Sequence, residues 1–248
     1  MKVAVLGAKG KMGRECVAAI SAASDLQLVA QIDLGDDISQ IKSAGAQVII
    51  DFTNPDSVMK NLEFAITNGI SAVIGTTGFN DKKINKVKQL LSENPKVGVL
   101  IAPNFGIGAI LMMQFAKQAA AHFDSAEIME FHHASKADAP SGTAARTAEL
   151  ISKERKAKNK KAMPDATKTA LPGARGAKVG DVQIHSIRSD GYVAHQEVVF
   201  GSSGETLTIR HDSIDRAGYM PGVLLGIREV TKNPGLTVGL ENFMPEFK

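Results

Sequence analysis

The sequence predicts an α/β protein: a Rossmann-type, doubly wound parallel sheet with a second, α+β domain inserted into it. Three observations favour this fold class. Short apolar runs alternate with amphipathic segments over the first hundred residues. A glycine-rich loop follows the first of these runs. Beyond about residue 125 the pattern changes to successive strands with almost no helix between them, which indicates a separate open sheet.

The first hundred residues predict a chain of βα units. The apolar run Lys2–Leu6 is typical of a buried strand, and the glycine-rich loop follows it directly. A helix from Arg14 to about Ala23 and a strand at Leu28–Ile32 complete the first unit. Repeated units of this kind give a parallel sheet with helices on both faces. The further strands expected are Gln47–Asp51, Ser71–Gly75 and Val97–Ile101, and the further helices are Pro55–Asn68 and Asp81–Ser92.

The glycine-rich loop has the layout of a dinucleotide-binding turn. Gly7 would make the tight turn, Gly10 would let the backbone approach a pyrophosphate, and Gly13 would let the helix pack against the strand. Asp33 ends the second strand about 20 residues further on, where an acidic residue accepts hydrogen bonds from the adenosine ribose. The spacing is GxxGxxG rather than GxGxxG, so the motif alone is only moderately specific. Its position between a strand and a helix favours a dinucleotide site.

Two further loops rich in small residues follow predicted strands, at the edge where doubly wound sheets bind their ligands. Each could line a nicotinamide ribose and ring. The simpler explanation, that Gly and Pro only turn the chain there, has equal weight for each loop taken alone. The loops are Gly75-Thr76-Thr77-Gly78-Phe79 and Ala102-Pro103-Asn104-Phe105-Gly106.

The inserted domain is expected to consist of a long apolar helix, Ile107–Phe123, and an open, antiparallel or mixed sheet of about four strands. Gly201–Gly204 is typical of a hairpin turn between the last two strands. The strands expected are Ala126–Phe131, Asp181–Arg188, Val193–Phe200 and Glu205–His211.

The chain should then return to the first domain. A helical segment at Arg216–Lys232 is ended by Pro234-Gly235. We therefore expect a dinucleotide-binding domain made of residues 1–106 and 216–248. Residues 107–215 would form a domain for substrate binding and oligomerisation.

The stretch Glu130–Thr143 carries the clearest chemical signal. It joins a predicted strand to a predicted helix, Thr143–Ile151, and a helix N-terminus offers backbone N–H groups and a positive dipole end to an anion. Ser141 is the expected N-cap, and Gly142 lets a ligand approach the backbone closely. With two imidazoles and an ammonium beside it, this corner could bind a carboxylate or phosphate and move a proton. Each residue alone is better explained as solvated, and their grouping reverses that preference. The three titratable residues are His132, His133 and Lys136.

Composition limits the class of protein. The chain has 248 residues, 44% hydrophobic and 22% charged, as in an ordinary globular protein. No apolar run approaches the roughly 18 residues that span a bilayer, and the short first run does not resemble a signal peptide. We therefore expect a cytoplasmic protein without a membrane partner. The single cysteine, Cys16, excludes an intrachain disulfide and a cysteine-cluster metal site.

Nucleic acid and metal are not expected as partners. Much of the basic excess, within a net charge of +3, lies at residues 153–178. That segment has no interleaved aromatic residues to stack bases, so a solvated surface explains it better. The histidines outside the Glu130–Thr143 stretch are scattered, and their spacing does not resemble a pair of zinc ligands.

Taken together, these motifs give a specific resemblance. The stretch Glu130–Thr143 resembles the signature of the 4-hydroxy-tetrahydrodipicolinate reductase family, also called dihydrodipicolinate reductases. The resemblance extends to Gly7–Gly13 and to both small-residue loops, and so covers the whole chain. It implies the reduction of a cyclic unsaturated imine dicarboxylate by NADH or NADPH, with loss of water, in diaminopimelate and lysine synthesis. It also implies a homotetramer built through the inserted sheet.

The same resemblance implies roles for individual residues. His132 would be the proton donor or acceptor, and Lys136 a second proton donor. His133, Gly142 and Thr143 would contact the substrate carboxylates, at the helix start that Ser141 caps. Gly7, Ala8, Lys9, Gly10, Lys11 and Met12 would hold the pyrophosphate, Asp33 the adenosine ribose, and Gly75, Thr76, Thr77, Ala102, Pro103, Asn104 and Phe105 the nicotinamide half.

Two positions depart from the family pattern, and two other functions stay open. Gly106 stands where many relatives have Ser, and Leu34 where some have Arg, which bears on NADPH binding. Asp33 favours NADH, while Lys9 and Lys11 can attract a 2′-phosphate, so we expect both cofactors to be used.

One alternative function is that of another two-domain NAD(P)-dependent amino-acid dehydrogenase. The other is a nucleotide-sensing protein without catalysis, which should lack the proton donors.

Overall fold

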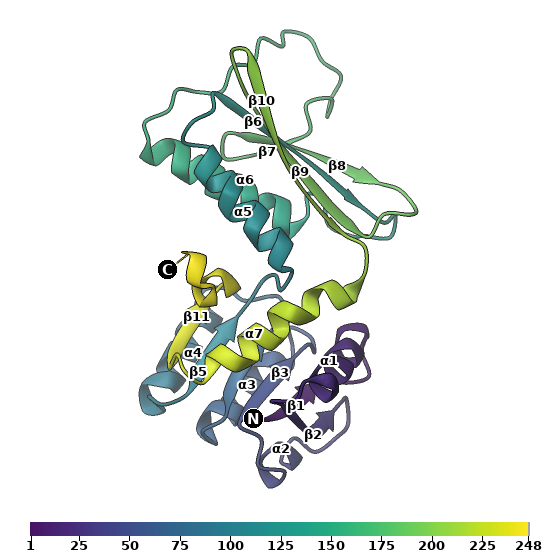
Figure 1. The fold of residues 1–248 in the computed structure, drawn as a ribbon, viewed down its shortest axis with the longest axis vertical. Helices are drawn as coiled ribbons and strands as arrows, with labels where there is room; N and C mark the ends of the chain where they lie inside the picture. Colours follow the sequence, from purple (N-terminus) through teal and green to yellow (C-terminus); the bar gives the residue numbers. More distant parts are fainter. Residues whose placement is uncertain (248) are drawn as a thin grey trace. The chain divides into compact units, whose positions relative to one another are not determined.

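The computed structural model describes residues 1–247. The chain divides into two compact units, Met1–Gly106 with Arg216–Lys248, and Ile107–Asp215 (Figure 1). Each unit is built around its own sheet. No helix within residues 1–247 is long and apolar enough to cross a membrane.

The first unit holds a six-stranded parallel sheet in the order β11-β5-β4-β3-β1-β2. The strand order reverses beside β1, which lies between β2 and β3, so the carboxyl ends of β1 and β3 flank the crevice where such sheets bind ligands. All four residues of β3, β4 and β5 are buried, as expected of strands covered on both faces. The strands are β1 (Lys2–Leu6), β2 (Gln27–Ile32), β3 (Val48–Asp51), β4 (Ser71–Ile74), β5 (Gly98–Ile101) and β11 (Gly235–Val238).

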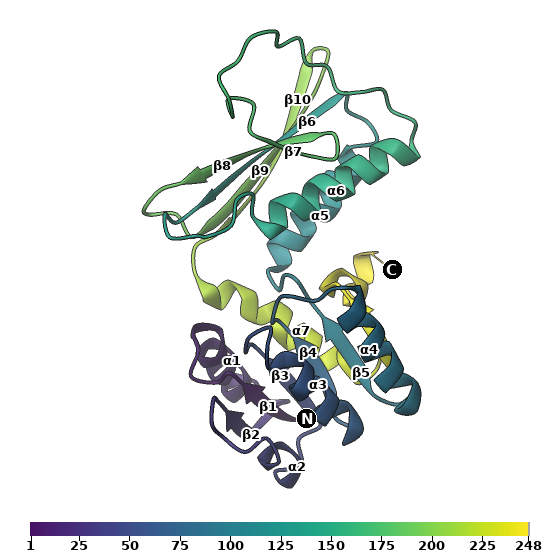
Figure 2. The same ribbon diagram turned by 180° about the vertical axis from the view of Figure 1, so that it is seen from behind.

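Helices cover both faces of this sheet. One layer has α1 beside α7, and the other has α3 beside α4 (Figures 1 and 2). The helices are α1 (Lys11–Ala22), α2 (Gln40–Ser43), α3 (Val58–Thr67), α4 (Asp81–Glu93) and α7 (Met220–Val230), with short 3₁₀ turns η1 (Arg216–Tyr219), η2 (Leu240–Phe243) and η3 (Pro245–Phe247).

The second unit is a mixed five-stranded sheet in the order β10-β9-β6-β8-β7, with α5 and α6 packed side by side on one face (Figure 2). β6 runs parallel to β8 and antiparallel to β9, so the carboxyl ends of β6 and β8 lie together. The elements are α5 (Ile107–Ala119), β6 (Ser125–His132), α6 (Gly142–Ala157), β7 (Ala177–Val179), β8 (Val182–Arg188), β9 (Ala194–Ser202) and β10 (Glu205–Ser213).

The predicted fold class is confirmed, and its details differ at short elements. The inserted sheet has a fifth strand, β7, in addition to the four expected. The helical pattern at 216–232 begins with the 3₁₀ turn η1 and becomes α-helical at Met220. The long helix that starts at Ile107 ends at Ala119, short of the expected Phe123. A sixth strand, β11, follows Pro234 where only a helix stop was expected, and it completes the edge of the first sheet beside β5.

Candidate functional site

The glycine-rich loop is packed too tightly for side chains. A Cβ added to Gly13 would lie 2.0 Å from the carbonyl oxygen of Gly7, and one added to Gly7 would lie 2.6 Å from the carbonyl oxygen of Phe52. Gly7 also has a φ of 75°, which favours glycine. Gly10 is the N-cap of α1, and it has no side chain to occupy the helix N-terminus. The first turn, which begins at Lys11, therefore presents backbone N–H groups beside two lysines, a donor set that fits a pyrophosphate.

Asp33 lies beside this loop, immediately after β2. Its carboxylate accepts hydrogen bonds from the backbone N–H of Lys9 at 2.7 Å and of Leu34 at 2.8 Å. The bonds from Leu34 and Lys9 lower the pKa of the Asp33 carboxyl below its ordinary value. Each carboxylate oxygen has a further lone pair, so an ionised acceptor is present where a dinucleotide's ribose hydroxyls would lie. The residues of this loop and strand end therefore fit the adenosine half of NAD(P).

The loops after β3 and β4 are held together by one buried carboxylate. Asp51 is fully buried, and its Oδ1 accepts hydrogen bonds from the hydroxyls of Thr53 and Thr76, both at 2.7 Å. Its Oδ2 accepts a third bond from the amide of Asn61 at 2.7 Å. Because Thr76 belongs to the loop expected to contact the nicotinamide half, Asp51 fixes the position of that loop.

Aromatic packing links the same edge to the loop after β5. The rings of Phe52 and Phe105 are 5.6 Å apart between centroids, and Phe105 is buried. The Phe52 ring also fills the space beside Gly75. A Cβ added to Gly75 would lie 2.1 Å from the nearest atom of that ring. In the loop after β5, the Asn104 side chain accepts a hydrogen bond from the N–H of Gly106 at 2.8 Å. The expected cofactor residues of the first unit therefore lie in the loops after β1, β2, β4 and β5, and Asp51 and Phe52 at the end of β3 pack against two of these loops.

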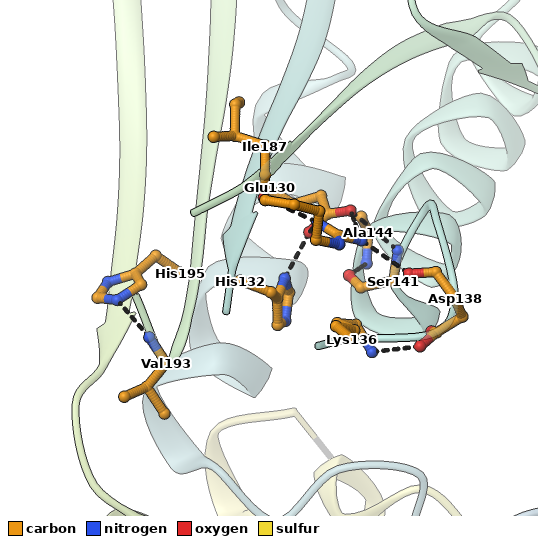
Figure 3. Close-up of polar contacts among 10 residues, drawn as sticks. Glu130, His132, Lys136, Asp138, Ser141, Ala144, Ile187, Val193 and His195 are labelled. Atoms are coloured by element: carbon orange, nitrogen blue, oxygen red, sulfur yellow. Dashed lines mark hydrogen bonds and ion pairs between the residues drawn. The ribbon is translucent and has the colours of Figure 1, made fainter. Parts of the chain in front are cut away.

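In the second unit, the carboxyl end of β6 carries a buried glutamate beside a histidine. Glu130 and His132 alternate onto the same face of the strand, and Glu130 Oε2 lies 2.5 Å from His132 Nδ1 (Figure 3). Glu130 is fully buried, while the His132 side chain is 14% exposed. Burial opposes ionisation of Glu130, but hydrogen bonds from His132, Arg188 and Ser186 outweigh it and lower the pKa of this carboxyl to about 2. Glu130 is therefore a carboxylate at neutral pH.

The helix start expected at Ser141 is confirmed. The Ser141 hydroxyl accepts a hydrogen bond from the N–H of Ala144 at 3.2 Å, as an N-cap does. Its own N–H donates to Glu130 Oε1 at 3.2 Å, so the strand end and the helix start are joined directly (Figure 3). Gly142, the first residue of α6, is exposed, and nothing lies within 4 Å of the position of a Cβ. The backbone at the N-terminus of α6 is thus open to an anion.

The loop between β6 and α6 carries the remaining expected residues. Lys136 Nζ donates to Asp138 Oδ1 at 2.6 Å, and its side chain is 21% exposed (Figure 3). The hydrogen bond from Lys136 lowers the pKa of the Asp138 carboxyl. His133 Nδ1 lies 2.8 Å from the Ser135 hydroxyl. His132, Lys136 and Ser141 therefore come together within one strand–loop–helix corner of the second unit.

Sequence reasoning missed the residue that braces this corner. Arg188, the last residue of β8, pairs in register with His132 because β6 and β8 are parallel. Its guanidinium donates to both oxygens of Glu130, at 2.9 and 2.8 Å, and to the carbonyl oxygen of Asp138 at 2.7 Å. The sequence marks it only as a charged residue at the end of a strand that mixes apolar and polar residues. Glu130 lies at the start of the stretch Glu130–Thr143, but the sequence alone indicates no role for it.

Comparisons with known proteins agree with one another over almost the whole chain. Two family models match: dihydrodipicolinate reductase, N-terminus, over residues 1–105, and dihydrodipicolinate reductase, C-terminus, over residues 108–244. The 4-hydroxy-tetrahydrodipicolinate reductase of Mycolicibacterium gilvum (strain PYR-GCK) is 58% identical over 244 residues, 98% of this chain and 99% of that protein. The protein of the same name from Nocardia farcinica (strain IFM 10152) is 57% identical and covers 98% of both. A dipicolinate-bound dihydrodipicolinate reductase from Paenisporosarcina sp. TG-14 is 39% identical, with a TM-score of 0.86 over 98% of both chains.

Proposed function

Because the chain belongs to the dihydrodipicolinate reductase family, we propose that the corner at Glu130–Thr143 binds the dicarboxylate substrate and supplies its proton. The reaction is the reduction of 4-hydroxy-tetrahydrodipicolinate to tetrahydrodipicolinate with NADH or NADPH and with loss of water, in the diaminopimelate route to lysine. The observation that carries the proposal is that one strand–loop–helix corner joins two potential proton donors to an open helix N-terminus.

The first unit would hold the cofactor. The first turn of α1 and the two lysines at its start would bind the pyrophosphate, and Asp33 the adenosine ribose. The loops after β4 and β5 would orient the nicotinamide half. When bound, the reduced nicotinamide supplies the hydride. The residues assigned to the cofactor are Gly7, Ala8, Lys9, Gly10, Lys11, Met12, Asp33, Gly75, Thr76, Thr77, Ala102, Pro103, Asn104 and Phe105.

The N-terminus of α6 would bind a substrate carboxylate. Gly142 and Thr143 belong to its first turn, where backbone N–H groups and the helix dipole favour negative charge. His133 lies on the same loop, two residues before its hydroxyl partner Ser135. Ser141 would contribute as the N-cap, because its hydrogen bond from the N–H of Ala144 holds this first turn in position. Backbone N–H groups would thus bind one carboxylate of the substrate, and side chains would bind the other.

The proton would come from Lys136 or His132. Reduction of the unsaturated imine leaves a carbon that must take a proton, and a general acid in reach of that carbon delivers it. Lys136 can release a proton from Nζ, which Asp138 holds in place. His132 can release one from Nε2, because its Nδ1 faces Glu130. The family match does not favour the alternatives, another amino-acid dehydrogenase or a sensor without catalysis.

Single substitutions test the two proton donors. His132→Ala and Lys136→Ala should each lower kcat by about 100-fold or more, the scale of a lost general acid. Neither residue belongs to the unit that carries the glycine-rich loop, so the dissociation constant of NADH should stay within about twofold of the parent value. Stopped-flow absorbance of reduced nicotinamide and equilibrium cofactor titration give both quantities. Near-normal turnover in both variants would exclude the assignment.

We further propose that the protein is a homotetramer assembled through residues of about 107–215 and that it works in the cytoplasm. Helices cover only one face of the second sheet in the described residues, which supports a second copy as the partner of the other face.

A further inference from the structure

Glu130 is an unusual residue for an enzyme core. It is a fully buried carboxylate, and it accepts hydrogen bonds from three parts of the unit: the His132 ring, the Arg188 guanidinium and the Ser141 backbone N–H. Taking a carboxylate and a guanidinium out of water is costly, and an apolar pair of similar size often gives equal stability. Fold stability alone therefore gives little reason for an ion pair at this position.

Arg188 extends the same contacts to the loop that carries Lys136. Its guanidinium clamps both oxygens of Glu130 and also donates to the carbonyl oxygen of Asp138. The Asp138 carboxylate in turn accepts the hydrogen bond from Lys136. The Glu130–Arg188 ion pair thus contacts the His132 ring directly. It also contacts the backbone of Asp138, whose carboxylate accepts the hydrogen bond from Lys136.

The direction of the Glu130–His132 contact fixes which ring nitrogen can exchange protons. Glu130 is ionised, so it can only accept, and His132 Nδ1 must be the donor in this bond. Nε2 is then the ring nitrogen that gains and loses a proton. A neutral partner at position 130 would not impose this, because an amide can offer either an oxygen or an N–H to the ring.

We propose that the Glu130–Arg188 ion pair is a positioning element for the reaction: it holds His132 as the Nδ1–H tautomer, with Nε2 as its proton-exchanging atom. This proposal rests on the proposed function, in which His132 exchanges a proton with the substrate. Arg188 acts one step further away, by keeping Glu130 ionised and both of its oxygens oriented. Neither residue is assigned a contact with substrate.

The test compares Glu130→Gln in two backgrounds. In the parent, Glu130→Gln should lower kcat by about tenfold or more, the scale seen when a carboxylate that orients a histidine is lost. In the His132→Ala background the same change should alter kcat by less than about twofold, because residues that act as a unit are not additive. A merely structural glutamate would lower kcat by the same factor in both backgrounds, and that result would overturn the proposal.

A spectroscopic measurement reads the tautomer itself. Long-range ¹⁵N–¹H correlation spectra of the full-length protein, assigned by loss of the His132 signals in His132→Ala, should show the neutral ring with its proton on Nδ1. In Glu130→Gln the Nδ1 and Nε2 shifts should move towards a mixture of tautomers. Unchanged shifts in that variant would contradict the proposal.

Two further variants control for folding. Arg188→Lys keeps a cation beside Glu130 but loses the two-pronged contact, so it should show the same non-additive pattern with a smaller loss of kcat, even if Glu130→Gln does not fold. Asp181→Asn removes the carboxylate partner of another buried arginine, Arg155, in the same unit. The kcat of Asp181→Asn should equal the parent value. A loss as large as that of Glu130→Gln would mean that breaking any buried ion pair of this unit lowers kcat, and would count against a specific role for Glu130.

The design separates the two hypotheses. If both His132→Ala and Lys136→Ala keep normal turnover, the proposed function is wrong, and if His132→Ala alone does so, the positioning proposal is overturned while Lys136 stays the proton donor. If His132→Ala loses turnover while Glu130→Gln keeps both its turnover and its tautomer, only the positioning role is wrong.

Discussion

At the scale of single residues, we expect the preference between NADH and NADPH to depend on three charges near the start of α1. Asp33 stays ionised because two backbone N–H groups lower the pKa of its carboxyl, and a carboxylate repels a 2′-phosphate. Lys9 and Lys11 are flexible cations that act on a phosphate as point charges. Leu34 is 96% exposed and offers no guanidinium for a bidentate grip. Repulsion and attraction roughly offset, so we expect both cofactors to be used, NADH somewhat better.

The double variant Lys9→Ala, Lys11→Ala should lose NADPH selectively. Exposed ion pairs contribute about 0.2–1 kcal/mol each, so the dissociation constant of NADPH should rise several-fold while that of NADH changes little. Raising the ionic strength should shrink the difference in NADPH affinity between parent and variant, because salt screens the attraction that the two lysines exert in the parent. Titrations of each cofactor at fixed ionic strength give the answer. Equal losses for NADH and NADPH would show that the lysines do not respond to the 2′ position.

Residue chemistry found the corner at His132 but not its support. Two histidines and a lysine before a capped helix start are visible in the sequence because the signal is local. Arg188 lies far along the chain, and its relation to Glu130 depends on β6 and β8 being parallel. A largely antiparallel sheet would have placed the end of that strand elsewhere. To predict the buried partners of a site, one must know which strands pair and in which direction, and the sequence of a single chain does not show this.

At the scale of elements, the sequence located long periodic segments better than short ones. β1 spans the residues expected, and most other predicted strands and helices lie within a few residues of those found. The α-helix and the strands missed were α2, β7 and β11, each of three or four residues. In β7, Ala177 and Lys178 are exposed, so no alternation of burial marks it. The strands β7 and β11 form because a neighbouring strand offers hydrogen-bond partners, and that is tertiary information.

The turn from β1 into α1 allows a prediction about an element as a whole. Gly13→Ala places a methyl group 2.0 Å from the Gly7 carbonyl oxygen and 2.8 Å from the Ala8 Cα, both backbone atoms. The helix must move away from the loop, which should cost about 1–3 kcal/mol of unfolding free energy and weaken NADH and NADPH alike. Gly218→Ala is the matched control in the same unit, because its Cβ would meet nothing within 4 Å. Denaturant unfolding and cofactor titration of both variants check this, and tight cofactor binding by Gly13→Ala would contradict it.

At the scale of the whole molecule, the second sheet has one face without a helix in residues 107–215. Residues on β6, β8 and β9 alternate, so that Ile128, Ile184 and Val198 are buried against the helix side. The opposite face keeps apolar side chains only partly covered, among them Ile187 and Val199. Such a face favours association with a second copy, and closed symmetry lets every copy cover it.

We expect light scattering at micromolar concentration to give about four times the 26.2 kDa mass of the chain. Val199→Lys should shift the mass towards smaller assemblies, because taking an ammonium out of water at an interface is costly and its cross-strand neighbour, Glu127, already contacts Arg175 and His185. Glu149→Lys, on the exposed side of α6, is the control and should leave the mass unchanged. A monomer mass for the parent would rule out the tetramer. A tetramer that Val199→Lys leaves intact would instead place the interface elsewhere on the second unit or outside it, and would exclude the uncovered sheet face as the assembling surface.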